Sequence, residues 1–113
     1  MTQSFRDFNI ENKKRTAAYA EQSPEVMGAF RELRQTVLKD GAVSTKNKEL
    51  IALGIAIAVR CEGCIGAHVV AAIDAGATRA ELIETIDVAV LMGGGPSIVY
   101  GPKAYAAVDE FLK

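Results

Sequence analysis

Apolar side chains recur along the chain at spacings of three and four residues, which is typical of α-helices. The pattern is clearest over residues 24–39, and strand-like alternation is weak throughout. Ser23 followed by Pro24 is a helix-start signal, because serine caps helices and proline suits the first helical position. Charged residues separate the apolar positions of this segment, which are Val26, Phe30, Leu33, Val37 and Leu38. We therefore predict an amphipathic helix over residues 24–39 with one face in the core.

Two further helices are predicted on either side of this segment. Residues 10–21 contain alanine and charged residues with few apolar positions, which indicates an outer helix. Ser44 or Thr45 can cap a helix over residues 46–60, whose second half is apolar on all sides. Such a helix belongs at the centre of a bundle.

The clearest start and stop signals lie in the second half of the chain. A helix is expected from Cys61 to about Ala75 and ends at Gly76, because glycine commonly follows the last helical residue. The next signal is Thr78–Glu81, "TRAE", which matches the capping-box pattern at a helix start. The helix that it opens is apolar at Leu82, Ile83, Ile86, Val90 and Leu91.

Three glycines at positions 93–95 are expected to break that helix, and Pro96 can start a last helical region that runs to Lys113. Gly101 and Pro102 should interrupt or kink this region, because proline removes a backbone hydrogen bond. The glycines follow a helix and lack the lysine and hydroxyl residue of a phosphate-binding loop. The predicted fold class is all-α, a bundle of five or six helices.

Composition and charge limit the classes of partner. Half of the 113 residues are apolar, enough for one core, and the apolar faces of several segments indicate surface buried between subunits of a homo-oligomer. The net charge is −1 and basic residues are scattered apart from residues 13–15, so we expect no nucleic-acid partner. The N-terminus lacks a secretory pattern and the apolar run 50–59 is too short to span a bilayer, so we expect a cytoplasmic protein without a membrane partner.

Both cysteines and the only histidine lie within residues 61–68. Cys61, Cys64 and His68 have the spacing that places three side chains along one face of a helix. A helix start favours a thiolate over a thiol, and a CxxC pair can cycle two electrons by closing a disulfide. His68 could then move protons. In a reducing compartment such a pair is not expected to be a structural disulfide.

Glu49 is a fourth candidate, because it is the last charged residue before the apolar run. A carboxylate there would tend to keep its proton and act as an acid or base, and it returns towards the cysteines if the two helices fold back on one another. Each residue also has a plainer interpretation: buried apolar cysteines, a structural histidine, or a solvated glutamate at a helix start. Zinc is the chemical rival, although structural zinc cysteines usually lie on knuckle loops.

The pattern E-x11-C-x2-C-x3-H, formed by Glu49, Cys61, Cys64 and His68, resembles the signature of the AhpD-like alkylhydroperoxidases in the carboxymuconolactone decarboxylase family. The resemblance extends over roughly residues 25–111. It implies one all-helical domain over residues 1–113, with 1–23 as an outer N-terminal segment and 24–113 as the helical core. It also implies an active site without a cofactor or metal.

By this resemblance, Cys64 attacks a hydroperoxide substrate and Cys61 resolves the sulfenic acid as a disulfide. Glu49 and His68 form a proton relay, and a lipoyl-type dithiol or a thioredoxin-like protein restores the thiols. The chain looks like the compact members of the family that assemble as hexamers, with a trimer as the next expectation. Glu62 and Gly63 stand between the cysteines, where the well-studied type has a histidine before the second cysteine.

Three alternatives stay open at this point. The chain could be a structural zinc protein or a non-catalytic oligomeric protein of the same fold. It could also be a carboxymuconolactone decarboxylase-type lyase, although that branch generally does not rely on a CxxC pair.

Overall fold

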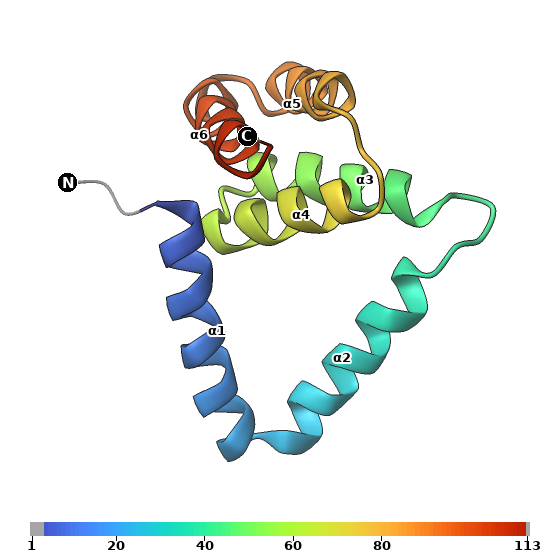
Figure 1. The fold of residues 1–113 in the computed structure, drawn as a ribbon, viewed down its shortest axis with the longest axis vertical. Coiled ribbons are helices and arrows are strands. Elements are labelled where there is room, and N and C mark those ends of the chain that lie inside the picture. The colour runs from blue at the N-terminus through green and yellow to red at the C-terminus, as the bar shows by residue number, and fades with distance from the viewer. Residues whose placement is uncertain (1–3, 113) are drawn as a thin grey trace.

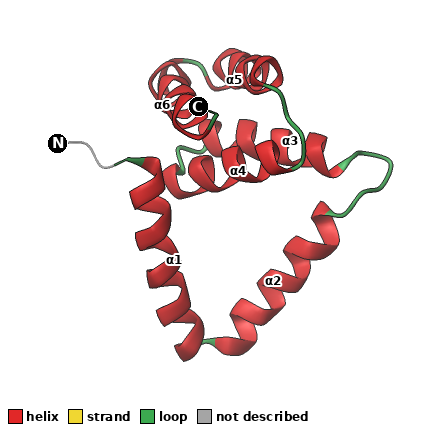
Figure 2. Ribbon diagram, viewed as in Figure 1, coloured by secondary structure: helices red, strands yellow, loops and turns green. Residues whose placement is uncertain are grey.

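Six helices make up residues 4–112, the part of the chain that the computed structural model describes (Figure 1). Figure 2 shows these helices joined by short loops, with no strand in the described part. The all-α prediction is confirmed. The helices are α1 (Phe5–Gln22), α2 (Pro24–Leu38), α3 (Thr45–Ala58), α4 (Glu62–Asp74), α5 (Arg79–Gly93) and α6 (Gly95–Phe111).

Helix α3 lies at the centre and packs against α4, α5 and α6. The predicted central position of this apolar helix is therefore confirmed. Its far side remains open, since Ile51 and Ile55 are 56% and 57% exposed. The core joins these four helices, and its largest fully buried apolar side chains are Leu53, Ile57, Ile65, Val69, Leu82 and Val108.

Helices α1 and α2 form a V whose corner points away from the other four helices (Figure 1), while α1 packs against α4 and α6 and α2 packs against α3. Neither helix contains a fully buried residue. The prediction that α2 buries one face in the core is wrong, because α2 packs mainly against its chain neighbours α1 and α3. Its apolar stripe is instead 53–60% exposed and consists of Val26, Phe30, Leu33 and Val37. The outer helix α1 is also longer than predicted and begins at Phe5.

The predicted capping signals at two helix starts are confirmed. The Ser44 hydroxyl accepts the Asn47 N–H at the start of α3. The Thr78 hydroxyl accepts the Glu81 N–H, and the Glu81 carboxylate accepts the Thr78 N–H, which completes a capping box. These bonds satisfy backbone N–H groups that a helix start leaves unpaired.

Two helix ends share one backbone geometry with different residues. Arg60 after α3 has φ 59° and Gly76 after α4 has φ 99°, so both lie in the left-handed region. In both turns the next N–H reaches back to a carbonyl oxygen near the helix end: Cys61 to Ala56 at 3.0 Å and Ala77 to Ala72 at 2.9 Å. The first turn places Cys61 directly at the start of α4.

Helix α6 runs without interruption from Gly95 to Phe111 and contains Pro102. The predicted interruption is therefore wrong. Gly101 is buried, and a Cβ atom there would lie 3.1 Å from the side chain of Val90 and 3.2 Å from that of Ile86. The glycine thus lets α5 pack closely on α6, and this packing supports the helix where proline removes a hydrogen bond. The predicted break before α6 is confirmed.

Candidate active site

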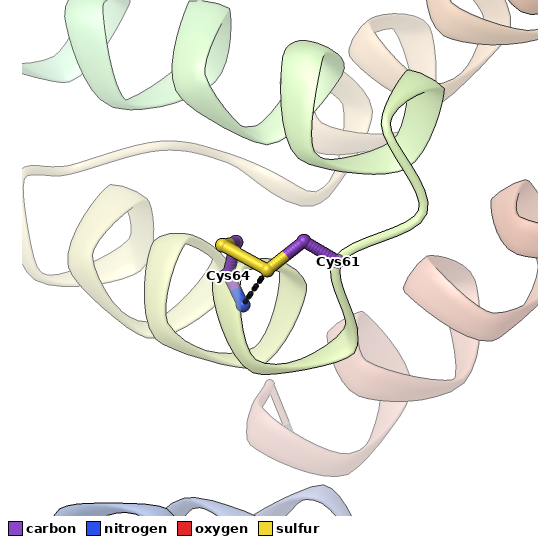
Figure 3. Close-up of a disulfide and its surroundings, with 2 residues drawn as sticks. All are labelled: Cys61 and Cys64. Atoms are coloured by element: carbon purple, nitrogen blue, oxygen red, sulfur yellow. Dashed lines mark hydrogen bonds between the residues drawn. A yellow bond between two sulfur atoms is a disulfide. The ribbon is translucent and has the colours of Figure 1, made fainter. Parts of the chain in front are cut away.

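The two cysteines lie at the first turn of α4. The helix was predicted to begin at Cys61, but it begins at Glu62 and Cys61 is its N-cap residue. The Cys61 sulfur accepts a hydrogen bond from the Cys64 N–H at 3.2 Å. The two residues are joined as a disulfide, with their Cα atoms 5.2 Å apart (Figure 3). A helix start carries partial positive charge, so it favours negative charge on a sulfur when the bond is reduced.

Glu49 and His68 form a hydrogen-bonded pair between α3 and α4. Glu49 Oε1 lies 2.6 Å from His68 Nδ1. Glu49 is only 4% exposed, so the interpretation as a solvated helix-start residue is wrong. His68 follows Cys64 by one helical turn on the same face of α4. A carboxylate on Nδ1 leaves Nε2 as the ring atom that can exchange a proton with the cysteine side.

A hollow of about 700 Å³ contains the cysteines and His68 in its lining. Its walls come from three helices: Phe8 of α1, the apolar stripe of α2 at Phe30, Leu33 and Val37, and the face of α4. Sequence reasoning missed these wall residues. Their signal was the amphipathic pattern of α2, which was assigned to the core because a pattern does not tell what an apolar face meets.

Glu62, which directly follows Cys61 in the sequence, is hydrogen-bonded to α6. The Lys103 ammonium group donates a hydrogen bond to the Glu62 carboxylate and lies 5.2 Å from the centre of the Tyr100 ring. This hydrogen bond raises the pKa of Lys103. Sequence reasoning singled out Glu62 but missed Lys103, since no local signal joins residues 41 positions apart.

Glycines on α4 determine how closely α1 approaches the site. A Cβ atom on Gly66 would lie 2.5 Å from the Asn9 side-chain oxygen of α1, so this position requires glycine unless Asn9 moves. A Cβ atom on Gly63 would be 3.5 Å from Asn12 and from Phe8, which is ordinary contact. Gly63, which lines the hollow, therefore faces Phe8 and Asn12 of its α1 wall, and Gly66 leaves room for the Asn9 side chain.

Neither a metal-binding cluster nor a membrane-spanning helix is present in residues 4–112, the described part of the chain. In this range no group of three or more His, Cys, Asp and Glu side chains is arranged to hold a metal ion. No helix in the same range is long and apolar enough to cross a membrane.

Known proteins share both the sequence pattern and the fold of this chain. The sequence pattern of the carboxymuconolactone decarboxylase family matches residues 24–110. A family protein from Legionella pneumophila, solved in its apo form, is 43% identical with a TM-score of 0.92, covering 96% of this chain and 97% of that one. A family protein from Thermotoga maritima is 26% identical with a TM-score of 0.82, covering 92% and 89%. An involvement in antioxidative response has been suggested for the Thermotoga protein.

Two curated relatives match over almost their whole length. A protein of Cupriavidus necator is 32% identical over 109 residues, which is 96% of each chain. Uncharacterized protein 4 in the cox locus of Paracoccus denitrificans is 36% identical over 105 residues, which is 90% of this chain and 95% of that one. The names of both relatives assign no activity.

Proposed function

The chain belongs to the carboxymuconolactone decarboxylase family, and within this family we propose that it is a thiol-disulfide oxidoreductase that reduces hydroperoxides. The observation that carries the proposal is the Cys61–Cys64 pair at a helix start, with His68 held by buried Glu49 on the same side of α4. The antioxidative response suggested for the Thermotoga relative supports the same reaction class.

The proposed reaction transfers two electrons from the thiols to the peroxide. The Cys64 thiolate attacks one peroxide oxygen, the O–O bond breaks, and the alcohol leaves after it gains a proton. Cys64 is then a sulfenic acid. The Cys61 sulfur attacks it, the disulfide forms and water leaves. A lipoyl-type dithiol or a thioredoxin-like protein would return both thiols and become a disulfide itself.

Two contacts support this division of roles. His68 lies one turn from Cys64, so its Nε2 can take the thiol proton and give it to the leaving alkoxide. Glu49 fixes the ring through Nδ1 and stabilises the imidazolium that forms. The Cys64 N–H already points at the Cys61 sulfur, where it would stabilise the thiolate that resolves the sulfenic acid.

The wider proposal includes the setting of this site. We propose one domain over residues 1–113 that works in the cytoplasm without a resident cofactor or metal, and that assembles as a homo-oligomer, first as a hexamer and next as a trimer. Exposed apolar side chains on α3 and α5 support assembly: Ile51, Ile55, Val88, Leu91 and Met92 are 56–78% exposed. Light scattering of the purified protein measures the number of chains.

Trapping the sulfenic acid tests the roles of the two cysteines. Reduced Cys61→Ser should hold a sulfenic acid on Cys64 after cumene hydroperoxide, and dimedone should add to that residue. Reduced Cys64→Ser should give no dimedone adduct at Cys61. An adduct on Cys61 with none on Cys64 would reverse the assigned order, and no adduct in either variant would contradict the peroxidase proposal.

Turnover tests the reductant. Dihydrolipoamide and reduced thioredoxin should each be supplied to the oxidised wild-type protein with cumene hydroperoxide and with hydrogen peroxide. We expect one of the two dithiols to sustain repeated turnover.

Zinc at about one ion per chain as purified, with loss of stability in chelator, would instead identify a structural metal protein.

A further inference from the structure

The chain exposes more surface than its mass explains. The accessible surface is 7255 Å², whereas a folded monomer of 12.0 kDa exposes about 6,000 Å². The excess of roughly 1,250 Å² is larger than the roughly 800 Å² that each partner buries in an interface of standard size. The radius of gyration is 14.3 Å, against about 13 Å for a compact domain of this length.

Helix α2 contributes to this excess in a way that a lone chain does not support. It has 15 residues and none is buried. Isolated helices of this length are marginal in water, and most helices gain their stability by packing an apolar face. The stripe at Phe30, Leu33 and Val37 is 53–59% exposed. Helix α2 therefore needs a partner for that face.

The stripe and the cysteines line the same hollow. Figure 1 shows α1 and α2 diverging from their shared corner, with α3 and α4 across the open side of the V. The hollow of about 700 Å³ in this region is lined by Leu33 of α2 and by Cys61, Cys64 and His68. A partner that covers the stripe of α2 therefore also covers the candidate active site.

We propose that the partner is a second copy of this chain, and that each copy places its α2 in the hollow of the other. The area argument favours a protein partner, because the excess surface of each chain is more than enough for one interface of standard size. A contact between two identical apolar stripes is self-complementary and closes with two-fold symmetry. The two α2 stripes then face each other, and each roofs the cysteines of the partner.

The role of the roof rests on the proposed function. In the assembled protein a small peroxide reaches the cysteines, while a bulky reagent is kept out by the α2 of the partner. Water is also partly displaced from the hollow, which strengthens the electrostatic interactions between His68 and the thiols. The face formed by Ile51, Ile55 and Met92 remains available for higher assembly.

Cross-linking tests the two-fold contact without any assay of activity. In a chain with Cys61→Ser and Cys64→Ser, a single Leu33→Cys substitution should form a disulfide between two copies under mild oxidation. Gln35→Cys lies on another face of the same helix and is the matched control. We expect at least tenfold faster dimer formation for Leu33→Cys. Equal rates for the two variants, or a wild-type mass of one chain at every concentration, would overturn the proposal.

A charge on the stripe tests whether the partner covers the site. Leu33→Glu should weaken assembly at least tenfold, while Gln35→Glu leaves it unchanged. Circular dichroism identifies a variant that has simply unfolded, and Leu33→Ala is the milder substitute in that case. In the reduced protein a bulky polyethylene-glycol maleimide should label the cysteines several times faster after Leu33→Glu. If labelling is unchanged in a variant that is folded and dissociated, the α2 of the partner does not cover the cysteines. The peroxidase proposal would still be decided by its own tests.

Discussion

Glu49 Oε1 and His68 Nδ1 lie 2.6 Å apart and join α3 to α4 beside the first turn that carries the cysteines. Because a buried carboxylate is costly without a hydrogen-bond donor, this contact stabilises the pairing of the two helices. The same contact fixes the tautomer and orientation of the imidazole. The pair thus connects the packing of the fold with the proposed proton transfer.

Replacement of Glu49 tests this pair as a unit. Glu49→Gln keeps the size of the side chain but removes its ability to stabilise an imidazolium, so peroxide should oxidise the reduced thiols about 100-fold more slowly. His68→Ala should lose a similar factor, and the double variant should be no slower than the slower single variant. Stopped-flow measurement of thiol oxidation gives all three rates. Independent, multiplying losses would show that the two residues do not act together.

Lys103 should influence the thiols through Glu62. Without its ammonium group, the Glu62 carboxylate stands unneutralised next to Cys61 and disfavours a thiolate. Lys103→Met should therefore raise the pH midpoint of iodoacetamide alkylation of the reduced protein, by about half a pH unit for an exposed charge at this range. Lys103→Arg should preserve the midpoint.

The double variant provides the control for this prediction. Glu62→Gln combined with Lys103→Met removes both charges and should return the midpoint to the wild-type value. A midpoint that stays raised would show that Lys103 acts on the thiols directly and not through Glu62.

Local sequence signals predicted the helices and their starts well because they depend on neighbouring residues. The capping box at Thr78 and the serine cap at Ser44 are satisfied by backbone groups three residues away. The return of Glu49 towards the cysteines was predicted only on the condition that two helices fold back on one another, and its pairing with His68 was implied only by the family resemblance. The apolar pattern around Leu53 made that pairing a reasonable expectation, because such a helix must be covered.

Where a helix face points was not predictable from the same signals. The stripe around Leu33 has the spacing of a core-facing helix, and the sequence does not distinguish a core from a hollow or from a second chain. Pro102 was expected to interrupt α6, but Gly101 lets α5 pack against the helix there. The surroundings of the α2 stripe and the continuity of α6 both depend on contacts between residues far apart in the sequence, which local patterns do not contain.

The cap of α5 gives a stability prediction that depends on pH. Thr78→Ala should lower the free energy of unfolding by about 1 kcal/mol, because the Glu81 N–H loses its acceptor. The Lys46 hydrogen bond, with help from the Thr78 N–H, lowers the pKa of Glu81 in the folded protein. The ionised Glu81 carboxylate therefore contributes its stabilisation in full above the pKa that Glu81 has in the unfolded chain. This contribution is lost as the pH falls through the lower pKa that Glu81 has in the folded protein.

Thermal unfolding of Glu81→Gln measures this contribution. The variant should melt at a lower temperature than the wild type at pH 7. The difference between the two melting temperatures should shrink as the pH falls below the ordinary value of 4.5 for this carboxyl group. A difference that does not change with pH would indicate that the ionised form of Glu81 is not what stabilises the cap.

The two left-handed turns predict opposite effects of matched substitutions. Arg60→Gly should stabilise the protein by up to about 1 kcal/mol, because glycine adopts φ 59° without steric cost. Gly76→Ala should destabilise it by about 1 kcal/mol, because a Cβ atom is unfavourable at φ 99°. Urea unfolding of both variants compares the two turns. A loss of stability in Arg60→Gly would show that the arginine side chain contributes more than its backbone costs.

The central claim is that Cys61 and Cys64 reduce hydroperoxides as a two-electron pair, and the free thiols after peroxide treatment measure it most directly. The reduced protein should be given one equivalent of cumene hydroperoxide, and its thiols should then be counted and its peptides mapped by mass spectrometry. We predict the loss of both thiols per chain, formation of a Cys61–Cys64 disulfide, and one equivalent of cumyl alcohol. Two thiols that remain titratable after excess peroxide would contradict the account.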